Sequence, residues 1–150
     1  NEHLDFQKVF DEVQLALCNE IEQFKPTFVV DFSASAQTVI FPKVYLKEIM
    51  VNLIDNAMRH NADNRDLIIK INTKVSDGRL ILNIIDNGKK KFTSREFEKL
   101  KNPYYSNCKD QSHTGLGLSK VEAIAQKVNS KFTIENPTDF EMMICKFVFP

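Results

Sequence analysis

The stretch Leu46-Lys-Glu-Ile-Met-Val-Asn-Leu-Ile-Asp-Asn-Ala-Met-Arg-His60 decides the fold, because its residue types repeat with the period of a helix. Side chains spaced near 3.6 residues share a helix face, and this run separates into two such faces. The apolar face predicts contact with a core, and it comprises Leu46, Ile49, Met50, Leu53 and Ala57. The polar face is left for chemistry, and it comprises Glu48, Asn52, Asn56 and Arg59.

The two asparagines one turn apart, Asn52 and Asn56, need an explanation, because the asparagine amide competes with the hydrogen bonds of a helix. An amide oxygen is a hard, neutral ligand that suits Mg²⁺, an ion that takes few protein ligands and shares phosphate oxygens and water. Arg59, one turn after Asn56, could then contact those phosphates. The alternative is that both asparagines line a solvated helix face.

Length and composition favour one cytoplasmic domain over residues 1–150, taken as a fragment of a longer protein. The chain is 43% hydrophobic, and its 20 basic and 20 acidic residues cancel, which gives no case for nucleic acid or for an anionic membrane surface. The three cysteines, Cys18, Cys108 and Cys145, show no metal-ligand spacing and are expected to be free thiols in a reducing compartment. No apolar run approaches the roughly 20 residues of a membrane span, and the polar start is no signal peptide.

Hydrophobic periodicity and turn residues predict the remaining elements. Helices are expected at 7–23, from Pro42 through the site stretch, at 93–100 and at 115–128. Strands are expected at 27–32, 38–41, 67–75, 79–86, 132–135 and 143–149, with 67–75 and 79–86 forming a hairpin. Residues 89–114 otherwise lack regular pattern, which is typical of a mobile lid. This order predicts an α+β sandwich with helices on one face of a sheet.

A second site signal is Asp86-Asn-Gly88, which follows the strand at 79–86. A partly buried carboxylate there could accept a hydrogen bond from the exocyclic amine of adenine, and Gly88 would let a base approach the backbone. The same triplet is also an ordinary turn.

A third signal is Thr114-Gly-Leu-Gly-Leu118, where glycines open a helix. The N–H groups and the dipole of a helix N-terminus bind phosphate without a cationic side chain. The alternative is a flexible helix entry, because the motif is neither a complete P-loop nor a dinucleotide fingerprint.

Together, Asn52-Leu-Ile-Asp-Asn-Ala57, Asp86-Asn-Gly88 and Thr114-Gly-Leu-Gly-Leu118 closely resemble the N, G1 and G2 boxes of the histidine-kinase catalytic domain. The resemblance covers about residues 4–150, includes an F-box-like Asn102-Pro-Tyr-Tyr-Ser106, and extends to the gyrase, chaperone and mismatch-repair ATPases. It implies a two-layer α/β sandwich, with a mixed sheet of about five strands covered on one face by about three helices. ATP would lie between the central helix and a flexible lid.

The resemblance also implies roles for individual residues. Asn56 would be the principal Mg²⁺ ligand and Asn52 a supporting contact, while Arg59 and His60 would contact phosphate. Asp86 would read adenine, and Gly115 and Gly117 would cradle phosphate. The implied ATP-binding set is completed by Gly88, Thr114, Leu116 and Leu118.

Asn52 points to a histidine as the phosphoryl acceptor. Gyrase-like and chaperone ATPases and the related serine kinases resemble one another in a glutamate base at this position, and an amide cannot take a proton. A neutral histidine is already nucleophilic and needs no such base. Because His3, His60 and His113 lack phosphoacceptor-like surroundings, the expected partners are a dimerisation and phosphoacceptor domain of the same protein and a response-regulator receiver domain.

Two departures from the family pattern define the rival hypothesis. Lys90 and His113 stand where the G1 and G2 boxes have glycine, and a non-glycine residue forced into a left-handed conformation costs about 1–2 kcal/mol. The rival is a degenerate nucleotide-binding or docking module with little or no kinase activity. A self-sufficient ATPase is a further alternative, which Asn52 disfavours.

Overall fold

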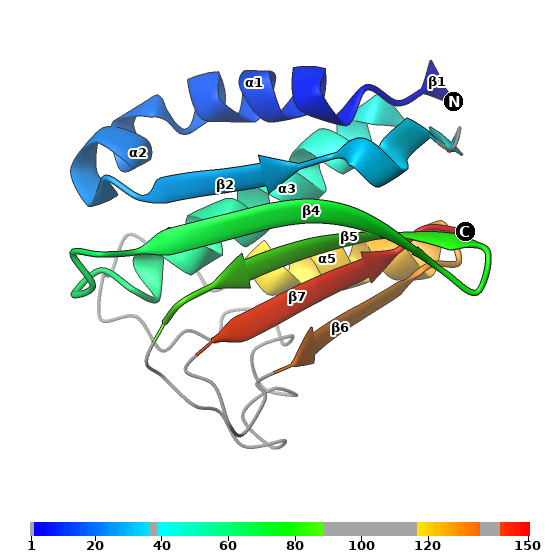
Figure 1. Ribbon diagram of the computed structural model, residues 1–150. Coiled ribbons are helices and arrows are strands. Elements are labelled where there is room, and N and C mark those ends of the chain that lie inside the picture. The colour runs from blue at the N-terminus through cyan, green and yellow to red at the C-terminus, as the bar shows by residue number, and fades with distance from the viewer. Residues whose placement is uncertain (1, 37–38, 89–116, 136–141) are drawn as a thin grey trace.

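A mixed five-stranded sheet forms one layer of the protein, and helices form the other (Figure 1). The computed structural model describes residues 2–36, 39–88, 117–135 and 142–150. The helices are α1 (Phe6–Ala16), α2 (Cys18–Phe24), the 3-10 helix η1 (Ser33–Ala36), α3 (Lys43–Arg59) and α5 (Gly117–Lys127). The strands are β1 (Glu2–His3), β2 (Thr27–Asp31), β3 (Ile40–Phe41), β4 (Ile68–Ser76), β5 (Arg79–Asp86), β6 (Lys131–Glu135) and β7 (Met143–Val148).

The strand order of the main sheet is β2-β4-β5-β7-β6. Strand β2 runs parallel to β4, and the other neighbours are antiparallel. The predicted hairpin of β4 and β5 is confirmed, and its turn has positive φ angles at Asp77 (52°) and Gly78 (75°). Two successive positive φ angles match the twist of paired strands, which explains why this dipeptide closes the hairpin.

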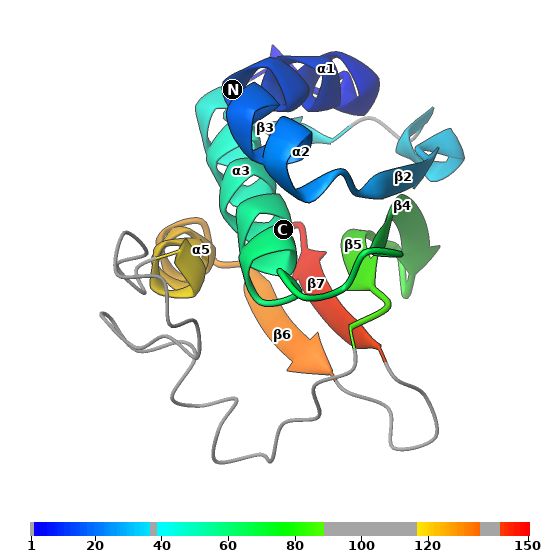
Figure 2. The same ribbon diagram turned by 90° about the vertical axis from the view of Figure 1, so that its left-hand side faces the viewer.

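Helix α3 is the centre of the helical layer, since it packs against α1, α5 and strand β5 (Figure 2). Its buried face is wider than the predicted apolar stripe, because Ile54, Met58 and Asn56 are also buried. Asn56 is only 4% exposed, so a solvated helix face is the wrong interpretation for this asparagine. Contact on three sides removes most of the surface that an amphipathic helix would leave in water.

The expected helix at 7–23 is two helices, which corrects the sequence-based prediction. The chain bends at Leu17 (φ −104°, ψ 19°), although its N–H still donates to the Val13 carbonyl at 2.9 Å. Leu17 is buried, and the bend keeps it on the core between α1 and α2. Apolar period alone cannot detect such a bend, because the spacing of Val13, Leu17 and Ile21 stays helical.

Two other predictions differ in detail or fall outside the described part of the chain. The strand expected at 38–41 is the short β3, which pairs with β1 in a separate two-stranded sheet. The expected helix at 93–100 and the lid at 89–114 lie outside the described residues, as does the F-box-like segment. Within the described ranges, no helix is long and apolar enough to span a membrane.

Four phenylalanines pack together at the end of the molecule that lies opposite Asp86. The ring of Phe149 lies 5.0 Å from that of Phe41, 5.2 Å from Phe147 and 5.7 Å from Phe6, centroid to centroid. The interplanar angles of 86°, 67° and 88° are those of edge-to-face packing, which favours aromatic pairs beyond simple area burial. The cluster joins α1, β3 and the end of β7.

We therefore expect Phe149→Ala to lower the free energy of unfolding by about 3–5 kcal/mol, because the side chain is fully buried among aromatic rings. Urea denaturation followed by circular dichroism measures this change. The matched control is Leu15→Ala in α1, where the side chain is 76% exposed and an effect within about 0.5 kcal/mol is expected. Equal effects of the two substitutions would contradict the role of the cluster.

Candidate functional site

Asp86 is a buried carboxyl at the end of β5, with 4% of its surface exposed. Its Oδ1 accepts a hydrogen bond from the Gly88 N–H at 2.9 Å. Burial raises the pKa of Asp86 to about 6, although hydrogen bonds from Gly88 and Asn61 act in the opposite direction. Relative to the ordinary value of 3.8, ionising this group in the folded chain costs about 3 kcal/mol.

The sign of this shift sets its pH dependence. Because the pKa is higher in the folded chain, folding takes up a proton between about pH 4 and pH 6. The contribution of Asp86 to stability is therefore fully present below pH 4 and is lost as the pH rises through 6. At neutral pH the site holds a mostly ionised carboxylate at a cost to folding, which is typical of a functional group.

Gly88 and Asn61 fit tightly around this carboxyl. A Cβ atom added to Gly88 would overlap Asn61 Oδ1 and would lie 2.7 Å from Asp86 Oδ1. Asn61 follows the end of α3, and its Nδ2 donates to the Ala57 carbonyl at 2.7 Å. The absence of a side chain at Gly88 thus allows the end of the central helix to reach the end of β5.

Sequence reasoning missed Asn61. The available signal was a third polar residue directly after Arg59-His60, four positions beyond the helix residue Ala57. That spacing lets an amide donate to a carbonyl of the last helical turn. Its contact with Asp86 and Gly88 depends on the pairing of distant segments, which no local pattern contains.

Asn87 has a structural role that differs from that of its two neighbours. Its Oδ1 accepts from the Ile68 N–H at 2.8 Å, and its Nδ2 donates to the Asp66 carbonyl at 2.9 Å. Asn64 Nδ2 also approaches Asn87 Oδ1 at 3.4 Å. These bonds attach the connection between α3 and β4 to the end of β5, so the Asp-Asn-Gly triplet is more than an ordinary turn.

At the middle of α3, Asn52 lies against the start of α5. Asn52 Nδ2 donates to the Glu48 carbonyl at 2.7 Å, which directs its other amide atom, Oδ1, away from that bond. This Oδ1 lies 3.4 Å from the place that a Cβ of Gly117 would occupy. Leu118 is buried and anchors the first turn of α5, so the structure brings Asn52 and Gly117 together. Thr114, Gly115 and Leu116 lie outside the described residues.

Asn56 and His60 complete the polar side of the central helix. Asn56 is one turn beyond Asn52, and its carbonyl accepts the His60 N–H at 3.0 Å. Both side chains are buried, at 4% and 6% exposure. Polar groups buried near the end of a helix are unusual unless they serve a site or a network, because their desolvation is costly.

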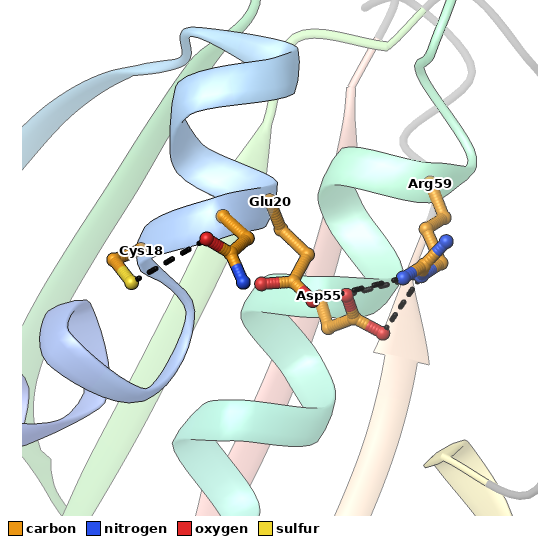
Figure 3. Close-up of polar contacts among 5 residues, drawn as sticks. Cys18, Glu20, Asp55 and Arg59 are labelled. Atoms are coloured by element: carbon orange, nitrogen blue, oxygen red, sulfur yellow. Dashed lines mark hydrogen bonds and ion pairs between the residues drawn. The ribbon is translucent and has the colours of Figure 1, made fainter.

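Arg59 is held by carboxylates in this structure. Its Nε lies 3.1 Å from both oxygens of Asp55, and its Nη2 lies 3.9 Å from Glu20 Oε1 in α2. Figure 3 shows the guanidinium group directed toward Asp55. The phosphate contact expected of Arg59 stays a prediction, and it would require the guanidinium to share or exchange these partners.

Cys145 adds an unreactive thiol near the same carboxyl. It is buried on β7, where its Cα pairs with that of Ile84. Burial raises the pKa of the Cys145 thiol well above its ordinary value, and the charge of Asp86 adds to the effect. The thiol is therefore protonated at neutral pH and acts as a small apolar group.

We expect Gly88→Ala to destabilise the protein by about 1–3 kcal/mol, because the added methyl group meets Asn61 and Asp86. Asn61→Ala removes one of these obstacles, so the double variant should lose less stability than the sum of the single losses. A double-mutant cycle from urea denaturation measures this coupling.

The control for this cycle is Gly78→Ala in the hairpin turn. No atom lies within 4 Å of a Cβ at Gly78, and only its φ of +75° resists a side chain. The loss of unfolding free energy in Gly78→Ala should simply add to the loss in Asn61→Ala, with no coupling between the two. Simple additivity in both pairs would show that Gly88 and Asn61 are not in contact.

Comparisons with known proteins agree with this geometry. A family model described as "Histidine kinase-, DNA gyrase B-, and HSP90-like ATPase" matches residues 43–147. The sensor protein RprX of Bacteroides fragilis (strain YCH46) is 25% identical over 126 residues, which are 82% of this chain. Those residues match 24% of RprX, so the chain spans about a quarter of that protein.

Two further similarities concern a second relative and a solved structure. An anti-sigma F factor of Clostridium botulinum (strain Alaska E43 / Type E3) is 28% identical over 102 residues, 67% of this chain and 69% of that protein. The catalytic domain of histidine kinase ThkA superposes with a TM-score of 0.81 at 19% identity, over 99% of this chain and 94% of that chain. This superposition confirms the predicted α+β fold. Since the family match covers the central helix, the hairpin, α5 and most of β7, the chain belongs to the histidine kinase-, DNA gyrase B- and HSP90-like ATPase family.

Proposed function

We propose that this chain is the ATP- and Mg²⁺-binding catalytic domain of a sensor histidine kinase. It transfers the γ-phosphoryl group of ATP to a histidine on a separate dimerisation domain. The observation that carries the proposal is the convergence on α3 of two polar sites, with Asp86 and Gly88 at its end and Gly117 against Asn52. One site suits a base, and the other suits phosphates.

At the base end, Asp86 would accept a hydrogen bond from the exocyclic amine of adenine. An ionised carboxylate is a stronger acceptor than an amide, and a hydrogen bond to a charged group contributes about 1.5–3 kcal/mol. Gly88 would contribute indirectly, because its missing side chain leaves room for Asn61, whose hydrogen bond helps to hold the Asp86 carboxylate. Burial of Asp86 favours the interaction, because a new donor replaces the solvation that the carboxylate has lost.

At the phosphate end, Asn56 would ligate Mg²⁺ through its amide oxygen, with Asn52 in support. The donor chemistry fits, since Mg²⁺ takes hard oxygen ligands and completes its shell with phosphate and water. When bound, the ion neutralises charge that develops on the transferring phosphoryl group. The first turn of α5, next to Asn52, offers backbone N–H groups and a helix dipole to the phosphates.

The acceptor follows from the chemistry of Asn52. Phosphoryl transfer depends mainly on positioning and electrostatic stabilisation, so a neutral imidazole can attack without a base from this domain. The match to a protein named as a sensor supports such a role. ThkA was also solved in complex with the response regulator protein TrrA, which supports a receiver domain as the later partner.

A second candidate function is a nucleotide-binding docking module with little or no kinase activity. The match to anti-sigma F factors, over more than two thirds of their length, favours it. The two functions differ in one observable, because a docking module binds ATP without passing its phosphoryl group to histidine.

The decisive experiment mixes the chain with the histidine-bearing dimerisation domain of its own parent protein and γ-labelled ATP. We expect label on the dimerisation domain that is lost in acid, as phosphohistidine is, and kept in base. Asn56→Ala should abolish transfer and weaken Mg²⁺-dependent ATP binding at least about tenfold, which corresponds to about 1.4 kcal/mol. Titration calorimetry measures the binding part.

The matched control is Asn19→Ala, which removes an exposed asparagine of α2. It should leave both transfer and affinity unchanged, and thermal unfolding of each variant checks the fold. ATP binding without any transfer would favour the docking module. Unchanged affinity in Asn56→Ala would remove this residue from the metal site.

A pH prediction follows from Asp86. The ionised carboxylate is the stronger acceptor for the adenine amine, so ATP affinity should fall by up to about tenfold between pH 7 and pH 5 as Asp86 protonates near pH 6. Inorganic triphosphate, whose phosphates titrate in the same range, provides the baseline, and the ratio of the two affinities isolates the base. In Asp86→Asn this ratio should be lower at pH 7 and independent of pH. A wild-type ratio that does not change with pH would make Asp86 structural.

A further inference from the structure

Within the part of the chain that the structure describes, no helix covers the face of the sheet that lies away from the helical layer (Figure 2). We call its central part, where β4, β5 and β7 lie side by side, the outer face. Ile81 and Ile85 of β5 and Ile144 of β7 form its floor, and each of them is half-buried. Lys70 and Lys74 stand on β4, to one side of the β5 isoleucines, and Lys146 stands on β7 beside Ile144, to the other side.

The outer face is hollowed along this floor. One hollow of about 440 Å³ is lined by Ile81, Asn83, Ile85 and Ile144, with Lys74 and Lys146 at its sides. A smaller hollow of about 130 Å³ adjoins it at Ile85 and reaches Asp86 and Met142. An apolar floor with polar edges is the composition of a protein contact surface.

The rim has more lysines than carboxylates, although Asp31 of β2 stands on the same face, opposite Asn72 and between the levels of Lys70 and Lys74. Lys70 and Lys74 are exposed, and no carboxylate among the described residues pairs with either of them. Lys146 has one partner, Glu135 of β6, at 3.0 Å. A chain with no net charge overall therefore presents a basic patch here, which would attract an acidic partner.

Asn83 is the polar residue at the centre of this apolar floor. It lies at the centre of the outer face, only 5% exposed, and its Nδ2 donates to Asn72 Oδ1 at 3.0 Å. Its own Oδ1 is buried, and no donor among the described residues reaches it.

From these features we propose that the outer face docks an acidic amphipathic helix of a partner protein. Strands β4 and β7 are separated by β5 alone, so their lysines stand about 10 Å apart, which is also the diameter of a helix. Leucine-like side chains of the partner helix pack on the isoleucine floor, and carboxylates on the two flanks of that helix meet the lysines. A second copy of this chain fits poorly, because two such faces would oppose like charges.

The site is separate from the proposed ATP site, although the smaller hollow touches Asp86 from the other side of the sheet. The docking surface and the proposed adenine site are nevertheless adjacent in sequence, since Ile85 of the outer face immediately precedes Asp86. The proposal does not depend on kinase activity, and variants of the outer face should keep their affinity for ATP.

The test uses a synthetic 18-residue helix with leucines at i, i+3, i+4 and i+7 positions and glutamates beside them, and a matched peptide with lysine for every glutamate. Fluorescence anisotropy should show that the acidic peptide binds at least tenfold more tightly and weakens in high salt. Amide chemical shifts should change on β4, β5 and β7. The pair Lys70→Glu and Lys74→Glu should reduce binding at least tenfold, and Ile81→Thr should weaken it as well.

Lys8→Glu is the control, because Lys8 is an exposed lysine of α1, and binding should not change. The proposal is overturned if both peptides bind equally, or if the shifts map to the helical layer. It is also overturned if phosphatidylserine vesicles or duplex DNA bind this face more tightly than the acidic peptide. Sedimentation that shows dimers sensitive to Lys70→Glu would assign the face to self-association instead.

Discussion

The burial of α3 on three sides is the constraint on which the rest of the structure depends. A helix packed against α1, α5 and the sheet buries about half of its residues, and these include Asn56, while His60 and Asn61, directly after the helix, are buried as well. The buried amide of Asn61 keeps a fixed orientation, because a change of rotamer would break its hydrogen bond to the Ala57 carbonyl in a medium of low dielectric constant. The core thus fixes the position of the helix and of the polar groups that the site uses.

The three residues Asp86, Asn87 and Gly88, at the end of β5, have different roles. Asp86 provides a carboxylate that is held ionised against its burial, Asn87 attaches the preceding connection, and Gly88 leaves room for the helix end. The hydrogen bonds of Asn87 stabilise the same segment that the ionised Asp86 destabilises. Such pairing of a costly functional group with a stabilising neighbour is common where function and folding share one turn.

Much of the fold follows from local pattern, and the site follows only in part. The central helix, the hairpin and the strand pair at the end were predictable because period and turn residues are properties of short segments. The bend at Leu17 and the burial of Asn56 were not, since both depend on what packs against the helix. The contact of Asn61 with Asp86 and Gly88 and the bonds of Asn87 belong to the same class, because they are set by pairing between segments distant in sequence.

The buried thiol on β7 has a practical consequence. Cys18 is exposed and should react with an alkylating reagent at once, whereas Cys145 can react only when the strands around Asp86 separate. Its labelling rate at a given reagent concentration therefore reports the free energy of that local opening, as hydrogen exchange does for an amide. Cys145 is therefore a natural probe of local opening at this corner of the sheet, next to Asp86, which is the one buried carboxyl among the described residues.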